Sequence, residues 1–170
     1  MSRFLGSILI IICLGLLFYG GLVIKEKNDQ PNNNLYVYFY YHDKFYPAKR
    51  NVSGLANRLD YILTELWKGP NASEKQRGII TLLPADLILL DHTLSNGTLC
   101  LTFNDKLLKI AGGNAIVEGL LKQIVFTCTQ FLNVQDVKFK VAGYQNNTLI
   151  IGGDGYTISA PLNREYFKEE

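Results

Sequence analysis

The stretch Leu35-Tyr-Val-Tyr-Phe-Tyr-Tyr41 alternates strictly in residue type, and this alternation predicts the first element of the folded part of the chain. The odd-placed residues of an extended strand point to one side and the even-placed residues to the other. One side of this strand is therefore mainly apolar and needs a covering layer, whereas the other side carries tyrosines. The tyrosines are Tyr36, Tyr38 and Tyr40.

The residues that follow predict one more extended piece and two helices. His42-Asp43-Lys44 is a turn that leads into Phe45 to Val52. Apolar residues then recur at helical spacing as far as Trp67, which predicts an amphipathic helix that begins near Ser53 and ends at Gly69-Pro70. A second helix is predicted over Asn114 to Leu132. Its buried side is formed by Val117, Leu121, Ile124, Cys128 and either Phe131 or Leu132.

Between and after the helices the pattern is that of strands. The apolar runs Leu87 to Leu94 and Thr98 to Phe103 flank Ser95-Asn96-Gly97, and an Asn-Gly pair in this setting predicts a tight hairpin. Asp136 to Ala142 is a further strand, and Gly152-Gly-Asp-Gly155 is a tight loop. This order predicts an α+β fold, a two-layer sandwich in which a small sheet carries two helices on one face.

The first 24 residues predict a membrane-spanning segment. Phe4 to Ile24 is a run of 21 residues without a charge, and as a helix it would be about 31 Å long, the thickness of the bilayer's hydrocarbon core. The alternative is a cleaved signal peptide, but the run is long and lacks a small-x-small cleavage site, which favours an uncleaved anchor. Residues 25–34 (KEKNDQPNNN) predict a flexible linker, and residues 35–170 the folded domain. We expect that domain on the outer side of the cell membrane.

Charge and motifs argue against several classes of function. The chain has 17 basic and 15 acidic residues, which is too small a surplus for a nucleic-acid binder held by phosphate contacts. His42 and His92 belong to no catalytic motif, and Cys100 and Cys128 lack the spacing of a zinc site. We therefore expect no catalytic, cofactor-binding or metal-binding residues. The two cysteines are interpreted as small core residues, with a disulfide between strand and helix as the alternative.

One surface suggests binding of a protein partner. The sheet face turned away from the helices is expected to carry the tyrosines of the first strand, joined by Thr102 and two lysines of the later strand. Tyrosine is favoured at protein interfaces, although the same residues also suit a plain solvated face. The candidate interaction residues are Tyr36, Tyr38, Tyr40, Lys138 and Lys140.

Several pieces of the chain, in this order and spacing, resemble the GerM domain of bacterial sporulation and spore-germination proteins. The resemblance covers about Leu35 to Tyr166. The matching pieces are Val37-Tyr-Phe-Tyr, then Leu63 to Pro70 (LTELWKGP), Asn96-Gly97, Gln123 to Phe131 (QIVFTCTQF) and Val137-x-Phe-x-Val-x-Gly143.

The resemblance implies a topology similar to the ring-building modules of secretion systems, and motif positions that are structural rather than catalytic. It implies a membrane-anchored module that supports an envelope-spanning complex, in the space between the membranes of a developing spore, with envelope proteins or further copies of itself as partners. The chain departs from the sporulation members because it has one domain where they commonly have two, and because it lacks their lipid-attachment cysteine. The alternative is a module that binds peptidoglycan or assists a cell-wall amidase.

Overall fold

The computed structural model describes residues 34–52 and 56–168. The predicted membrane-spanning segment at residues 1–24 and the linker as far as residue 33 lie outside the described residues. Asn34, which the sequence placed in the linker, is the first residue of a strand. Within the described ranges, no helix has both the length and the apolar character needed to cross a membrane.

The first described element is an antiparallel hairpin of two strands, β1 (Asn34–Tyr41) and β2 (Lys44–Asn51). The two residues between the strands, His42 and Asp43, have φ values of 44° and 60°, as a tight hairpin turn requires. Val37 and Phe39 are fully buried, so the apolar face predicted for the first strand is confirmed.

The first predicted helix is present as α2 (Arg58–Lys68) and ends before Gly69, as expected. It begins later than Ser53 because the Asn57 side chain accepts a hydrogen bond from the backbone N–H of Asp60 and so caps the helix there. A short helix, α3 (Ala72–Gln76), was not predicted. Its signal was present in the sequence, since Asn71 and Glu74 form a reciprocal capping box.

The main sheet has three strands in the order β3 (Leu89–Ser95), β4 (Thr98–Phe103) and β5 (Asp136–Val141). β3 and β4 are antiparallel around Asn96-Gly97, which confirms the predicted hairpin, and β5 runs parallel to β4. A separate antiparallel pair, β6 (Leu149–Ile151) and β7 (Tyr156–Ile158), flanks the predicted glycine loop. Two short 3-10 helices are η1 (Asp105–Lys109) and η2 (Arg164–Phe167).

The long helix α4 (Gly113–Cys128) is four residues shorter at its C-terminal end than predicted. Of the two alternatives for its last core residue, Phe131 is half-buried and Leu132 is fully exposed. The buried positions Val117, Leu121 and Ile124 are confirmed.

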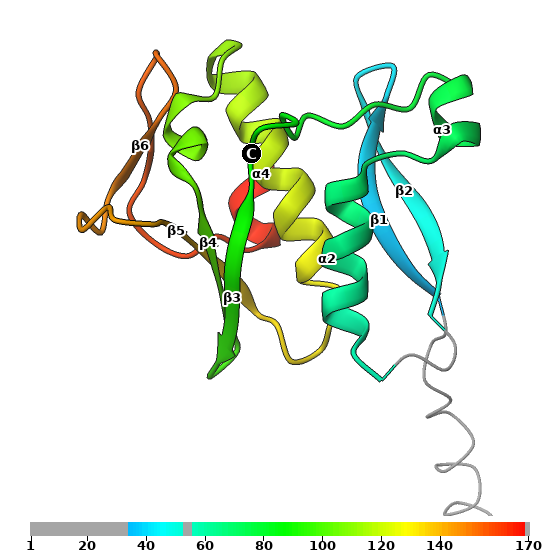
Figure 1. The fold of residues 1–170 in the computed structure, drawn as a ribbon, viewed down its shortest axis with the longest axis horizontal. Helices are drawn as coiled ribbons and strands as arrows, with labels where there is room; N and C mark the ends of the chain where they lie inside the picture. The colour runs from blue at the N-terminus through cyan, green and yellow to red at the C-terminus, as the bar shows by residue number, and fades with distance from the viewer. Residues whose placement is uncertain (1–33, 53–55, 169–170) are drawn as a thin grey trace, which may run out of the picture. The chain divides into compact units, whose positions relative to one another are not determined.

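The helices α2 and α4 lie between the β1–β2 hairpin and the β3–β4–β5 sheet (Figure 1). The α+β class is confirmed, but the strands form three separate sheets in place of the one small sheet that was predicted. Strands β1 and β2 form a sheet of their own because helix α4 occupies the free edge of β1, where a further strand would have to pair.

The predicted alternative of a disulfide is not present, since Cys100 and Cys128 are both free thiols. Cys128 is fully buried in α4, where burial raises the pKa of its thiol to about 12. Cys100 lies between Leu99 and Leu101, which point into the core, so it points to the opposite face of the sheet.

Candidate functional site

The tyrosines of β1 do not face solvent as a free surface, because two of them pack on α4. The Tyr38 ring stacks on Phe45, with the ring centres 4.8 Å apart, and meets the edge of Phe126. The Tyr40 hydroxyl donates to the carbonyl oxygen of Gly119 at 3.1 Å. Burial, helped by nearby Glu118, raises the pKa of Tyr40 to about 12. Of the three tyrosines, Tyr36 is the exposed one.

The two candidate lysines lie elsewhere. Lys138 and Lys140 belong to β5, opposite Cys100 and Thr102 of β4, on the outer face of the three-stranded sheet. The structure therefore brings these lysines next to Thr102, as predicted, but separates them from the tyrosines, which belong to the other sheet. The expectation of one shared face is wrong, because β1 never joins the sheet that contains β5.

The outer edge of β1 is covered from Tyr36 to Tyr40. Its outward N–H groups there, at alternate residues, have acceptors. Tyr36 donates to the Gln130 side chain at 2.8 Å, and Tyr38 donates to the Thr127 hydroxyl at 3.1 Å. Tyr40 donates to the carbonyl oxygen of Ile80 at 3.0 Å. Thr127 of α4, Gln130 just after the helix and the backbone of Ile80 thus satisfy a strand edge that would otherwise be open to pairing.

The outer edge of β2 is protected by its own residues. Tyr41 and Lys44 flank a two-residue turn and form the first hydrogen-bonded pair, so every second residue after Lys44 faces inward. Pro47, opposite Tyr38, falls at an outward position and offers no N–H there. Lys44 and Lys49 add charges, which also discourage pairing between strand edges.

The outer edge of β5 is partly covered. Val137 and Leu162 exchange two backbone hydrogen bonds, each 2.8 Å long, and this bridge joins the last described part of the chain to the sheet. The opposite margin of the same sheet is formed by β3.

The edge formed by β3 has no helix cover, no proline, no lysine and no bridging segment among the described residues, although a register shift interrupts the strand between Leu89 and Asp91. Ser95 and Thr98 flank the two-residue turn, so the alternation turns the backbone groups of Leu94 and His92 outward, away from β4. The outward N–H of His92 is covered locally, since it donates to the carboxylate of neighbouring Asp91 at 2.8 Å. The segment Leu89–Ser95 contains neither proline nor lysine.

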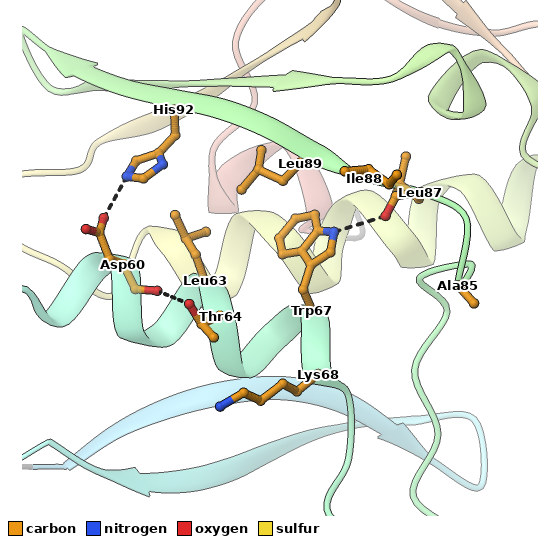
Figure 2. A pocket seen from close by; sticks show the side chains of 10 residues that line it. All are labelled: Asp60, Leu63, Thr64, Trp67, Lys68, Ala85, Leu87, Ile88, Leu89 and His92. Carbon is orange, nitrogen blue, oxygen red and sulfur yellow. Dashed lines mark hydrogen bonds and ion pairs between the residues drawn. The ribbon is translucent and has the colours of Figure 1, made fainter.

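A groove of about 540 Å³ lies between this edge and helix α2 (Figure 2). In Figure 2 the β3 strand forms one wall and α2 the other, with Trp67 and Leu63 reaching from the helix toward Leu89. Its lining is mainly apolar, and its charged groups are few. The lining residues are Asp60, Leu63, Thr64, Trp67, Lys68, Ala85, Leu87, Ile88, Leu89 and His92.

Trp67 fixes the floor of the groove. Its ring stacks on Phe103 of β4, with the ring centres 5.9 Å apart, and its indole N–H donates to the carbonyl oxygen of Leu87 at 3.2 Å. The sequence pattern that ended the first helix at this residue therefore also placed it against the sheet. One aromatic side chain joins the two walls of the groove.

Charged groups mark the two ends of the α2 wall. Near the start of the helix, the His92 ring nitrogen Nε2 lies 2.8 Å from a carboxylate oxygen of Asp60. Near its end, the exposed Lys68 ammonium donates to Glu65 at 2.8 Å. The groove therefore has an acidic group at one end and a basic group at the other, with apolar residues between them.

A second cluster of charges is buried and holds the hairpin to the helices. The Arg50 guanidinium of β2 donates to both carboxylate oxygens of Glu74, at 2.7 and 2.9 Å, and to Glu65 at 3.1 Å. Burial favours the neutral form of Glu74, but the hydrogen bonds from Arg50 and from the Asn71 backbone outweigh it and lower the pKa of Glu74. All members are paired, so this network is structural.

Among residues 34–52 and 56–168, no three or more His, Cys, Asp or Glu side chains gather as metal ligands would. The groove itself was not predicted from the sequence. Two signals could have indicated it: an apolar run from Leu87 to Leu94 with no protecting proline or lysine, and a tryptophan on the helix that faces it.

Comparison with solved structures finds the same fold in known proteins. The tandem GerMN domains of the sporulation protein GerM from Bacillus subtilis match with a TM-score of 0.57 and 24% identity, over 77% of this chain and 45% of that one. The first GerMN domain alone matches with a TM-score of 0.60 and 17% identity, over 78% and 98%. A putative lipoprotein from Clostridium perfringens matches with a TM-score of 0.53 and 21% identity, over 78% and 87%.

The chain thus spans less than half of the tandem-domain structure and nearly all of the single domain. No curated protein sequence matches it. The family model Germane, described as sporulation and spore germination, matches residues 36–147, which is well over half of the chain. The GerM resemblance drawn from the sequence is confirmed, and the chain belongs to the Germane family of sporulation and spore germination domains.

Proposed function

We propose that this chain is a non-enzymatic protein-interaction module that acts in sporulation or spore germination and supports the assembly of an envelope-spanning complex. The observation that carries the proposal is the apolar groove between α2 and β3, where a strand edge is left without cover. Membership of the Germane family supports the process.

The groove has the composition of a protein-binding site. Its floor contains a tryptophan, a residue that is enriched where interfaces gain most of their binding energy. Ile88, which lines the groove, is 52% exposed although its side chain is apolar, and so is Leu90, two residues further along the chain. Exposed apolar residues next to a concave apolar surface favour contact with another protein rather than with water.

The proposed location rests on the sequence. The charge-free run Phe4 to Ile24 supports a single membrane-spanning anchor. The folded domain would then lie on the outer side of the cell membrane. Its partners would be the membrane itself, through the anchor, and other envelope proteins or further copies of this chain. A short tether would confine the domain to the membrane plane and raise its effective concentration, so weak contacts would suffice for assembly.

Gene deletion and complementation test this proposal. Deletion should lower the yield of heat-resistant spores or slow their germination, and the wild-type gene should restore it. Complementation with Thr64→Arg should fail, because an arginine at this exposed position of α2 would project over the groove.

Thr157→Arg is the matched control. Thr157 is also exposed, and both threonine hydroxyls donate to a backbone carbonyl oxygen, Thr64 to Asp60 and Thr157 to Gly155. This control should complement fully. A deletion strain with normal sporulation and normal germination would contradict the proposed process, and full complementation by folded Thr64→Arg would contradict the role of the groove.

A second candidate function, binding of peptidoglycan, is favoured by a separate hollow of about 220 Å³ beside β5. Its polar lining includes Lys138, Lys140, Tyr144, Asn146 and Asn147. Amides, a tyrosine and lysines suit a glycan with acidic groups. Sedimentation with purified peptidoglycan, compared between the wild type and Tyr144→Ala, tests this function, and equal sedimentation of the two proteins would count against the hollow.

A further inference from the structure

We infer that the groove between α2 and β3 binds an extended peptide segment of a partner protein, which adds to the sheet as a fourth strand along β3. The inference rests on the proposed function, since it states how the interaction module recognises its partner. The segment has apolar residues at alternate positions and a lysine or arginine that reaches Asp60.

The backbone of β3 determines the extended form of the ligand. The outward groups are the N–H and carbonyl of Leu94 and the carbonyl of His92, two residues away, whose N–H already donates to Asp91. Only a chain in the β conformation repeats its own donors and acceptors with the same spacing, so only an extended segment can pair with both residues. Within the β1–β2 hairpin and the three-stranded sheet, the other edges are covered at Tyr38 by α4, interrupted by Pro47 or bridged by Leu162, which leaves β3 as the edge suited to pairing.

The floor of the groove determines that apolar residues occur at every second position of the bound peptide. Every second side chain of an added strand would point toward α2, where it meets Leu63, Trp67, Leu87 and Leu89. These positions of the ligand should be apolar. The side chains between them would point to the outer face of the sheet, toward solvent, and can be of any polar type.

The charges at the two ends of the groove determine where the bound peptide carries a basic residue and in which direction the peptide lies. The Asp60 carboxylate is half-exposed; one oxygen lies against His92 Nε2 and the other accepts from the Asn57 side-chain amide, and since each carboxylate oxygen has a second lone pair, the group can still accept from a further cation at the groove wall. At the opposite end, Lys68 would repel a lysine or arginine. The partner's basic residue should therefore lie at the Asp60 end, and an acidic residue is tolerated at the Lys68 end.

A second copy of this chain fits the groove less well. The strand with an open edge in a second copy is again Leu89–Ser95, which contains no lysine or arginine to place beside Asp60. Strand β2 does contain basic residues, but Pro47 interrupts its outer edge. We therefore assign the groove to a segment of a different protein.

A random 12-residue peptide library displayed on phage, selected on the full-length chain in detergent micelles, is the probe. We expect the enriched peptides to share apolar residues at alternate positions with a lysine or arginine at one end. A synthetic peptide of that consensus should bind at least about tenfold more weakly to Thr64→Arg than to the wild type and to Thr157→Arg. Asp60→Asn should reduce the preference for the basic residue by about threefold.

Methylation of the peptide backbone separates strand pairing from mere apolar contact. N-methyl groups at the alternate amides that face β3 should abolish binding, whereas N-methyl groups at the intervening amides should leave it within about threefold of the unmodified peptide. Equal effects of the two methylation patterns would overturn strand addition. The absence of any enriched consensus, or binding that Thr64→Arg leaves unchanged, would overturn the site.

The stoichiometry of the free chain is a further outcome. If light scattering shows that the full-length chain is a dimer and that Thr64→Arg makes it a monomer, the groove is occupied by a second copy and the assignment to a different protein is wrong. These failures differ from failure of the proposed function. If the deletion strain is defective in sporulation but no peptide binds, the proposed function is retained and only the peptide-binding inference fails. If the deletion strain is normal but peptides bind, the proposed role in sporulation or germination fails and the peptide-binding inference is retained.

Discussion

Strands β1 and β3 lie at the margins of two different sheets, but the edge of β1 is covered by neighbouring residues whereas the edge of β3 is largely open. The outward N–H group of β1 at Tyr38 donates to Thr127 of α4, and that at Tyr36 donates to Gln130, two residues after the helix ends. The outward groups of β3 at Leu94 belong to a strand that forms one wall of the groove, and no helix side chain is bonded to them among the described residues. The comparison teaches that the function of a strand edge depends on what covers it, because the backbone chemistry of the two strands is the same.

The covered edge also explains why an otherwise apolar helix carries buried polar residues. Gln123 and Thr127 of α4 are both fully buried. The side-chain oxygen Oε1 of Gln123 accepts from the backbone N–H of Leu82 at 3.0 Å, and its side-chain amide Nε2 donates to the Thr81 hydroxyl at 2.7 Å. The Thr127 hydroxyl accepts from the backbone N–H of Tyr38 and donates to the backbone carbonyl oxygen of Gln123. These side chains satisfy backbone groups of neighbouring segments that no strand pairs with.

The largest loss of stability is expected on the β3 side of the molecule, for Trp67→Ala. The substitution removes the stacking on Phe103 and the hydrogen bond to Leu87, and should lower the free energy of unfolding by about 3–5 kcal/mol. Urea denaturation followed by circular dichroism measures it. Trp67→Phe keeps an aromatic ring and should cost much less. Equal urea midpoints for Trp67→Ala and the wild type would mean that the floor of the groove is not formed by this residue.

A somewhat smaller effect is expected on the β1–β2 side, for Glu74→Gln. Loss of a charged partner of Arg50 should cost about 1.5–3 kcal/mol at pH 7. Because the pKa of Glu74 is lowered by folding, its contribution is present above the ordinary value of 4.5 and is lost as the pH falls through the lower, folded-state value.

The difference in unfolding free energy between Glu74→Gln and the wild type should therefore shrink when urea titrations are repeated in acid. Glu65→Gln is the control, since Glu65 makes one hydrogen bond to Arg50 at 3.1 Å and is the more exposed carboxylate. A Glu74→Gln deficit that is constant from pH 7 to pH 3 would contradict the ionic role of Glu74.

Thr127→Val should uncover part of the β1 edge. Valine has nearly the shape of threonine, so the cost arises from the unpaired N–H of Tyr38 and should be about 1–2 kcal/mol. Thermal unfolding measures it, and Thr102→Val on the outer face of β4 is the control, expected within about 0.5 kcal/mol of the wild type. If both variants unfold like the wild type, α4 does not protect this edge in the way described.

The smallest effect on stability is expected for Asp60→Asn. The pair with His92 is at the surface and partly exposed, so its loss should cost less than about 1 kcal/mol. The same variant should change which peptides bind the groove. A loss of several kcal/mol in a denaturation experiment would show that Asp60 supports the fold rather than the charge of the binding site.

Local patterns in the sequence predicted the elements well, because their causes are local. The alternation from Leu35 to Tyr41, the Asn96-Gly97 turn and the Gly69-Pro70 helix end all appear in the structure. The arrangement of layers could not be predicted in the same way. The period of a strand tells which side chains share a face, but not which element covers that face or that edge.

The tyrosines show this limit most clearly. Tyr36, Tyr38 and Tyr40 do share one side of β1, as the alternation indicated. Their burial against α4 depends on Phe126 and Gly119, which are about eighty or more residues away in the chain, and no pattern within the strand carries that information. The groove was missed for the same reason, since it is formed by two elements that meet only in the fold.

Amide hydrogen exchange measured by NMR tests most directly whether the β3 edge is open while the β1 edge is covered. In the protein without a peptide, the Leu94 amide should exchange roughly a hundredfold or more faster than the Tyr38 amide, which donates to Thr127. The Thr93 amide, which faces β4, is the internal control and should be protected like Tyr38. Protection of Leu94 equal to that of Thr93 and Tyr38 in the free protein would contradict the account, because the β3 edge would then already be covered.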